Sequence, residues 1–161
     1  MRIRCAKLLA LVLAACAMPV LAAGVEDSLA VIVPAGSSHR LAGREALAAV
    51  YRRKKQYWDD GQRIEALNLP AEDPRRQRFS QIVLGLTPQQ LDTYWSEMYF
   101  HGVLPPHVLA SVEAVLRLVS DTPAAIGYVP LCNADARVSI LFVFDADGKA
   151  VEKPSLEACP R

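Results

Sequence analysis

Apolar residues along this chain fall into short continuous runs that alternate with longer segments of helical spacing. The short runs are rich in β-branched residues and are bounded by Pro, Gly or Asp, which is typical of buried strands. Four of them are predicted as strands: 29–33, 64–69, 125–129 and 138–144. In the longer segments apolar positions recur every three or four residues, which predicts helices. These segments are 43–53, 74–84, 88–100 and 105–119.

The alternation of strands and helices predicts a single layered α/β domain with a mostly parallel central sheet flanked by helices. Gly127 interrupts the third strand, which indicates that backbone or a ligand approaches closely there. The third helix carries an apolar stripe that is interpreted as core. Its members are Leu91, Tyr94, Trp95, Met98 and Tyr99.

The first 22 residues have the organisation of a secretory signal peptide. A basic start is followed by a short apolar stretch at 8–15, and small residues stand ahead of Ala23. The basic residues are Arg2, Arg4 and Lys7. We therefore expect residues 1–22 to be removed on export and residues 23–161 to form the single domain.

A second interpretation of the N-terminus stays open. Residues 13–16, Leu-Ala-Ala-Cys, are similar to a bacterial lipobox, in which Cys16 is lipidated and becomes the mature N-terminus. The following residues, 17–23, are apolar, whereas lipoproteins usually carry a polar tether at that place. A membrane partner is expected only if Cys16 is lipidated.

The net charge of the chain argues against some classes of binding partner. The whole chain carries +1, and loss of the three basic residues of 1–22 leaves about −2. Nucleic acids and anionic membranes require a sustained basic surface, so this near balance argues against both. The remaining length, about 139 residues, is enough for one domain with one core.

Two cysteines remain after the first 22 residues, Cys132 and Cys159. In an exported chain a pair of this kind indicates a disulfide, with a metal pair as the alternative. In the chain-entropy model a disulfide closing such a loop contributes about 3 kcal/mol. We expect it to tie the last residues to the domain.

No pattern of catalytic residues stands out. His101 and His107 lie far from any cysteine or paired carboxylate, and Asp59-Asp60 beside Gly61 is typical of a turn. No Ser/His/Asp or Cys/His order, paired general acid and base, or metal cluster rises above chance. It is therefore predicted to be a non-enzyme without a metal or cofactor.

The functional lead is the place where the second strand gives way to a helix. Asp73 and Pro74 are typical of a helix start, and Arg75 and Arg76 follow in the first turn, where the helix dipole disfavours cations. A strand end that opens into a helix N-terminus is a common anion site in α/β proteins. Pairing of the arginines with Asp73 and Glu72 is the alternative explanation.

Taken together, residues 29–144 resemble the phosphate-binding proteins of bacterial ABC importers. The resemblance rests on Val50-Tyr51, Trp58, Asp60-Gly61, Ala66-Leu67-Asn68-Leu69, the arginine-rich helix start before Phe79, Tyr94-Trp95, Pro105-Pro106 and Ala125-Ile126-Gly127-Tyr128-Val129. It implies a type 2 periplasmic binding-protein fold and a location in the periplasm. Because family members have two lobes, a chain of this length implies about one lobe.

The resemblance also implies where an anion would bind. Family members hold phosphate with a Ser-Gly-Thr-Arg turn at a helix N-terminus, and these positions fall on residues 73–76. Arg76 matches the family arginine, whereas Asp73 and Pro74 replace the serine and the glycine.

Two hypotheses for the function follow. In the first, an exported solute-binding-like protein binds phosphate or a related oxyanion weakly, in phosphate uptake or sensing. Its expected ligand-binding residues are Ser37, Ser38, Asp73, Arg75 and Arg76. In the second, a periplasmic interaction module has lost the ligand and docks on an envelope protein or on a second copy of itself. Its candidate contact residues are Tyr57, Trp58, Tyr99 and Phe100.

Overall fold

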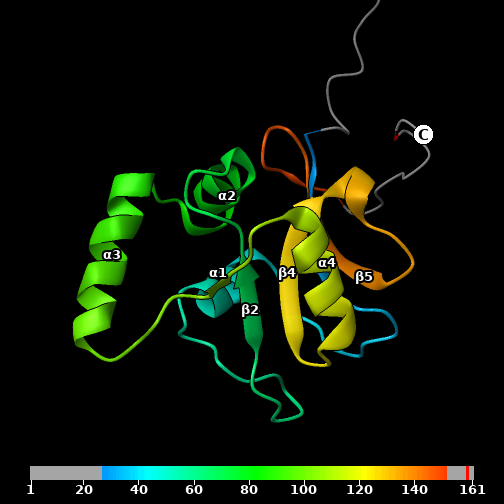
Figure 1. Cartoon of the computed structure of the whole chain (residues 1–161), viewed down its shortest axis with the longest axis horizontal. Coiled ribbons are helices and arrows are strands. Elements are labelled where there is room, and N and C mark those ends of the chain that lie inside the picture. Colours follow the sequence, from blue (N-terminus) through cyan, green and yellow to red (C-terminus); the bar gives the residue numbers. More distant parts are fainter. Residues whose placement is uncertain (1–26, 152–158, 160–161) are drawn as a thin grey trace, which may run out of the picture.

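The computed structural model describes residues 27–151 and 159. Helices and strands alternate along this part of the chain (Figure 1). The strands are β1 (Leu29–Pro34), β2 (Glu65–Asn68), β3 (His107–Val108), β4 (Ala125–Pro130), β5 (Val138–Phe144) and β6 (Ala150–Val151). The α-helices are α1 (Arg44–Tyr51), α2 (Pro74–Phe79), α3 (Pro88–Phe100) and α4 (Val112–Asp121). A π-helical segment (Ser80–Leu84) continues α2, and a 3-10 turn (Leu131–Asn133) follows β4.

The strands form one sheet in the order β3-β2-β4-β1-β5-β6. The predicted α/β class is confirmed, with one qualification for the pairing. β2 is parallel to both β3 and β4, whereas β1 is antiparallel to β4 and β5, and β6 to β5. The sheet is therefore mixed, because β1 runs against the strands on both sides of it. The C-terminal end of β1 thus lies at the edge of the sheet where β2 and β4 begin.

Helices cover both faces of β4. On one face α4 packs so closely that a Cβ atom added at Gly127 would lie 2.7 Å from Cγ1 of Val115 and 3.1 Å from Cγ2 of Val119. The close approach predicted at Gly127 is therefore to a helix. The next residue, Tyr128, points to the opposite face, as alternation along a strand requires. There its ring stacks on Phe79 of α2 with centroids 3.8 Å apart.

Part of the prediction for residues 105–119 is wrong. The helix does not begin at Pro105-Pro106: His107 and Val108 form the short edge strand β3, paired with Leu67 and Asn68 of β2. Helix α4 begins later, where the hydroxyl of Ser111 accepts a hydrogen bond from the backbone N–H of Ala114 at 3.1 Å. A serine N-cap sets the boundary here, because its hydroxyl accepts from one of the backbone N–H groups that a helix start leaves free.

The core stripe predicted on α3 is confirmed only in part, because Trp95 packs against the core with Leu91 but the far end of the helix does not. Only Leu91 of that helix is buried, while Tyr99 is 66% exposed and Phe100 86% exposed. Figure 1 shows α3 standing to one side of the sheet and its covering helices. The stripe has helical spacing, but no other described element covers the distal end of this helix.

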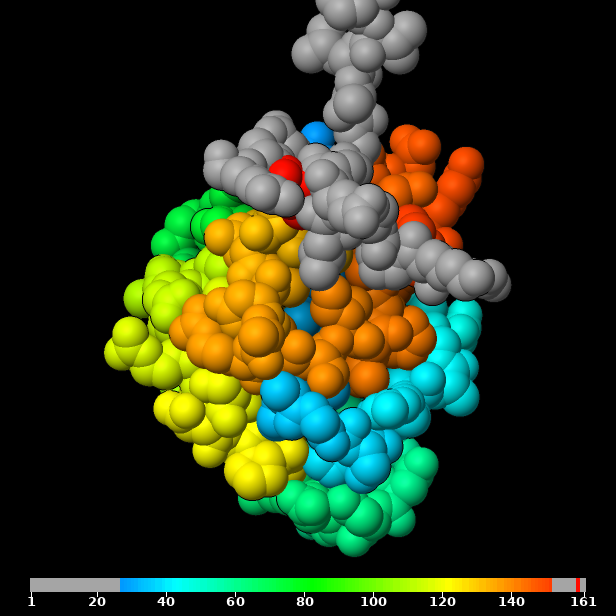
Figure 2. All heavy atoms as spheres, turned by 90° about the vertical axis from the view of Figure 1, so that its right-hand side faces the viewer, coloured from blue at the N-terminus to red at the C-terminus, as the bar shows by residue number. Residues whose placement is uncertain are grey.

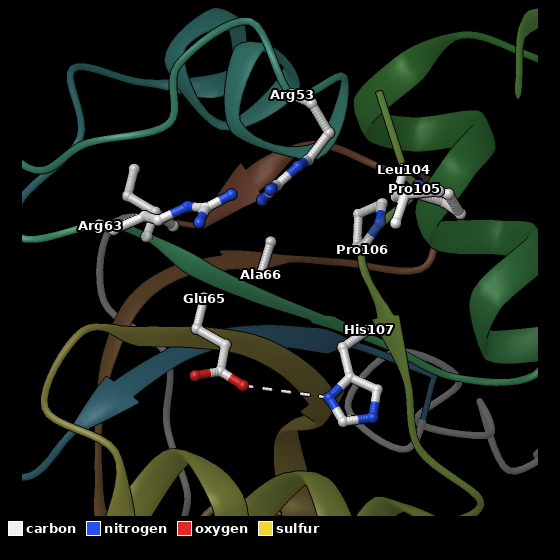
Figure 3. A pocket seen from close by; sticks show the side chains of 9 residues that line it. Arg53, Arg63, Glu65, Ala66, Leu104, Pro105, Pro106 and His107 are labelled. Carbon is white, nitrogen blue, oxygen red and sulfur yellow. Dashed lines mark ion pairs between the residues drawn. The ribbon is translucent and has the colours of Figure 1, made fainter. Parts of the chain in front are cut away.

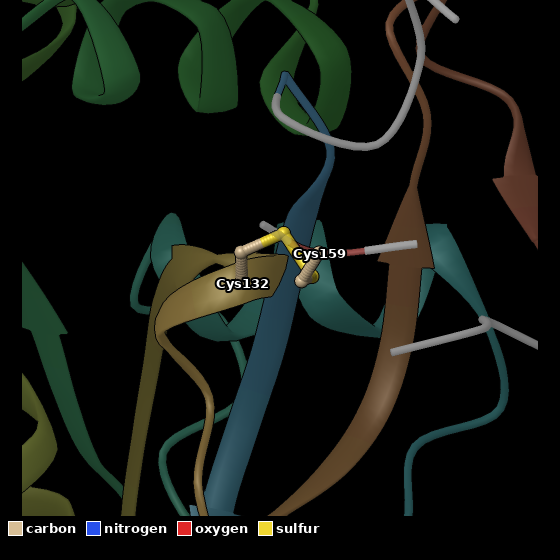
Figure 4. Close-up of a disulfide and its surroundings, with 2 residues drawn as sticks. All are labelled: Cys132 and Cys159. Atoms are coloured by element: carbon tan, nitrogen blue, oxygen red, sulfur yellow. A yellow bond between two sulfur atoms is a disulfide. The ribbon is translucent and has the colours of Figure 1, made fainter. Parts of the chain in front are cut away.

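The predicted disulfide is present (Figure 4). Cys132, in the turn after β4, is bonded to Cys159, with the two sulfur atoms 2.05 Å apart. The bond joins the end of a central strand to a residue near the C-terminus. The predicted signal peptide and the lipobox cysteine lie outside the described residues. Among the described helices, none has the length and apolar character needed to cross a bilayer.

Candidate functional site

The end of β2 is held firmly by buried hydrogen bonds. Asn68, 6% exposed, accepts a hydrogen bond at Oδ1 from the hydroxyl of Tyr128 at 2.6 Å. The hydroxyl of Tyr51 donates to the carbonyl oxygen of Leu67 at 3.0 Å. Two aromatic side chains from different elements thus fix the point from which the chain turns towards α2, which lies beyond the C-terminal end of β2 (Figure 1).

Asp73 caps α2 and is surrounded by donors from Arg75. One carboxylate oxygen accepts from the backbone N–H of Arg75 at 2.8 Å and from its Nε at 2.8 Å, and the other accepts from Nη2 at 2.5 Å. Hydrogen bonds from the Arg75 side chain hold the pKa of Asp73 below its usual range despite its partial burial, and Asp73 raises the pKa of Arg75. For Arg75 the internal pairing considered as an alternative is therefore what the structure shows.

Arg76 is placed differently. Its Nη1 donates to the carbonyl oxygen of Leu69 at 2.8 Å, and its other guanidinium N–H groups have no acceptor among the described residues. The side chain borders a groove of about 90 Å³ between α2 and α3. The groove is lined by Ala71, Arg76, Gln77, Ser80, Pro88, Leu91, Asp92 and Trp95. A small anion in this groove would meet the unused side of one cation and, from α3, the carboxylate of Asp92.

Ser37 and Ser38 do not join this site. The register that pairs Leu29 with Pro130 directs β1 away from the C-terminal end of β2. Both serines therefore lie at the opposite edge of the sheet, in a hollow of about 400 Å³ shared with Asp60 and Asp121. Figure 2 shows their segment at the surface, in blue, next to β5 in orange. The expected grouping of these serines with Arg76 was wrong because it assumed parallel strands.

A stacked pair of rings that sequence reasoning missed lies at the same edge of the sheet as Ser37 and Ser38. His39 lies parallel to Trp58, with centroids 4.3 Å apart, and its Nε2 is 3.1 Å from Oδ2 of Asp60. The indole Nε1 of Trp58 donates to the carbonyl oxygen of Ala124 at 2.9 Å. These contacts anchor the turn at Asp59-Asp60-Gly61, which confirms the prediction of a turn there.

A second cationic cluster was also missed. Arg53 and Arg63 border one hollow, although Arg53 belongs to a basic run, 52–55, of the kind that is typical of a solvated helix end. Spacing alone offered no signal, because the two arginines are ten residues apart and meet only after the intervening turn. Among the described residues, no group of three or more His, Cys, Asp or Glu side chains could hold a metal ion.

The described residues thus form an α/β lobe with helices on both faces of an open sheet and a cationic helix start at a strand end. No protein-family model matches the chain, and no curated protein matches it. Solved structures do.

An ABC-type phosphate transport receptor from Vibrio cholerae matches with a TM-score of 0.57 at 19% identity, over 71% of this chain and 45% of the receptor. PstS from Borrelia burgdorferi matches with a TM-score of 0.56 at 19% identity, over 71% of this chain and 46% of that chain. At this identity the likeness shows the fold. The chain thus has the fold of one part of these proteins, and it spans about half their length.

Proposed function

We propose that this chain is an exported, periplasmic solute-binding-like protein that binds phosphate or a related oxyanion weakly, in phosphate uptake or sensing, and that it is not an enzyme. The observation that carries the proposal is the position of Arg76. It stands at a helix start beyond the end of β2, borders a groove and keeps guanidinium N–H groups without an acceptor among the described residues. The solved structures with this fold include a phosphate transport receptor.

Two features limit the affinity. The carboxylate of Asp73 already occupies the donors of Arg75, so an arriving anion must compete with a charge that is part of the chain. The chain also spans about half the length of the receptors. A groove on one lobe is open to water, so each contact there acts in a high dielectric and contributes less.

Asp73 also bears on the choice of anion. Near neutral pH phosphate retains a proton that it can donate to a carboxylate, whereas sulfate carries none and meets Asp73 only as a like charge. The site is therefore expected to prefer phosphate to sulfate. Sulfate at matched ionic strength is accordingly the control for general salt effects.

Replacing Arg76 by alanine is expected to abolish the phosphate effect on thermal stability, because it removes the cation with unused donors. Arg78→Ala is the matched control. It removes an arginine from the same helix, but one whose Nη2 donates to the carbonyl oxygen of Asp145, away from the groove. Each variant is melted with and without millimolar phosphate and compared with its own ligand-free melt. If phosphate raises the melting temperature of Arg76→Ala as much as that of the wild type, phosphate does not bind at Arg76.

A second candidate function rests on the exposed aromatic side chains. Of the four aromatic residues considered for a docking surface, Trp58 is buried, whereas Tyr57, Tyr99 and Phe100 are 57%, 66% and 86% exposed. Exposed apolar side chains of this size mark interfaces. We propose as the alternative an interaction module that docks this side of α3 on an envelope protein or on a second copy of the chain.

Self-association through α3 is tested by sedimentation of the wild-type chain and of a Tyr99→Ser, Phe100→Ser double variant. If a second copy is the partner, the wild type forms a concentration-dependent dimer and the variant remains a monomer. A dimer that persists in the variant rules out this surface. A wild-type monomer at every concentration leaves only an envelope protein as the partner.

A further inference from the structure

The hollow in Figure 3 lies on the far side of β2 from β4, at the start of that strand. It has a volume of about 440 Å³, within the range of small-molecule sites. Edge strand β3 pairs only with Leu67 and Asn68, so it does not extend over the first residues of β2. The lining comprises Arg53, Arg63, Ile64, Glu65, Ala66, Leu104, Pro105, Pro106 and His107. None of these residues lines the groove beside Arg76.

Two guanidinium groups point towards each other in this hollow. Arg53 comes from the end of α1 and Arg63 from the segment that leads into β2 (Figure 3). Neither side chain has a hydrogen-bond acceptor or a carboxylate partner among the described residues, and Nε of Arg53 is buried without any partner. Burial, with the charge of Arg63 adding to it, lowers the pKa of Arg53. Two like charges with unmet donors are the arrangement that an anion stabilises.

The backbone at Arg53 is also unusual. Its φ of 60° makes it the one non-glycine residue with a positive φ in the described part of the chain. Helix ends commonly use a left-handed residue at this place, but it is usually glycine, because a side chain there is strained. Arg53 is held in this conformation with its side chain directed into a hollow. Strained residues of this kind cluster at binding sites.

The other lining residues indicate the chemical character of the rest of a ligand. Leu104, Pro105 and Pro106 supply an apolar side to the hollow. On the opposite face of β2, Nδ1 of His107 lies 3.9 Å from Oε1 of Glu65, so the Glu65 carboxylate points away from the two arginines (Figure 3). A ligand that fits has a strongly anionic head near the arginines and an apolar body against the proline segment.

We propose that Arg53 and Arg63 form a second binding site, for an organic dianion: a phosphate monoester or a dicarboxylate on an apolar body. Both heads present paired oxygen atoms that match the donor geometry of guanidinium groups. The site stands on geometry that is independent of the groove at Arg76. It therefore holds or fails separately from the binding of inorganic phosphate.

The test is isothermal titration of the protein, purified after expression of the full-length sequence, with phenyl phosphate and with phthalate. We expect at least one probe to bind, and Arg53→Gly and Arg63→Gln each to weaken that binding by about tenfold or more. Binding of phenyl phosphate alone assigns the site to phosphate monoesters, and binding of phthalate alone assigns it to dicarboxylates. Glycine suits the backbone at residue 53, so Arg53→Gly removes the guanidinium without new strain.

Arg117→Gln is the matched control, since it removes one exposed cation of α4 that borders neither hollow. It is expected to leave the affinity for the bound probe within about twofold. Failure of both probes to bind at millimolar concentration overturns the proposal. So does unchanged binding in either Arg53→Gly or Arg63→Gln. If binding is lost only in Arg76→Ala, the probe binds in the groove beside Arg76, and the proposal is likewise overturned.

Discussion

Replacing Asp73 by serine is expected to raise the affinity of the chain for inorganic phosphate by about tenfold or more. An anion that approaches the start of α2 meets the Asp73 carboxylate, and two unit charges about 4 Å apart repel by roughly 4 kcal/mol at an effective dielectric constant near 20. Its removal also frees Nε and Nη2 of Arg75, which Asp73 now holds. Serine is itself a good N-cap, so the helix start is retained.

The same substitution changes selectivity. Without a carboxylate to accept the proton of phosphate, sulfate is no longer disfavoured, and its affinity is expected to rise more than that of phosphate. Titration of both anions into the wild type and Asp73→Ser measures this. Asp59→Ser is the control, because it removes an aspartate from an exposed turn where its partner is Lys55. Equal phosphate affinity in Asp73→Ser and the wild type would show that no anion approaches this helix start.

Replacing Phe79 by alanine is expected to destabilise the protein by about 3–5 kcal/mol. Phe79 is 1% exposed and lies between two tyrosines, stacked on Tyr128 at 3.8 Å and edge-on to Tyr51 at 4.6 Å. A loss of this size lowers the melting temperature by about 10 °C or more in a domain of this length. The change also loosens the aromatic support beneath the start of α2.

Phe100→Ala is the matched control for Phe79→Ala. It removes the same side chain from α3, where Phe100 is 86% exposed, and its effect on the free energy of unfolding is expected to stay within about 0.5 kcal/mol. Chemical denaturation of both variants makes the comparison. A loss below about 1 kcal/mol for Phe79→Ala would contradict the view that α1, α2 and β4 share one core around this ring.

The local elements were largely predictable because their signals are local. The apolar run at 138–144 coincides with β5, and Asp73 with Pro74 marks the start of α2 as expected. Strand direction was harder to predict. A strand buried on both faces has a continuous apolar run whichever way it points, so nothing in Leu29–Val33 indicated that β1 runs against β4. The direction of β1 places Ser37 and Ser38 at the edge of the sheet opposite to Arg76.

Packing partners were equally hard to predict. The stripe on α3 has the spacing of a core-facing helix, yet spacing does not say whether another element covers it. Arg75 and Arg76 illustrate the same limit within the candidate site. From the sequence, both arginines are equally suited to bind an anion at the helix start. Only the structure shows that Arg75 is paired with Asp73 while Arg76 borders the groove.

The most direct test of the account is the thermal melting of the wild-type protein with and without millimolar phosphate, with sulfate at the same ionic strength. A ligand at ten times its dissociation constant stabilises the folded state by about 1.4 kcal/mol, which shifts the melting temperature by several degrees. Phosphate is expected to raise the melting temperature by more than sulfate does. Equal shifts with the two salts, or none with either, would contradict the proposal that this lobe binds phosphate.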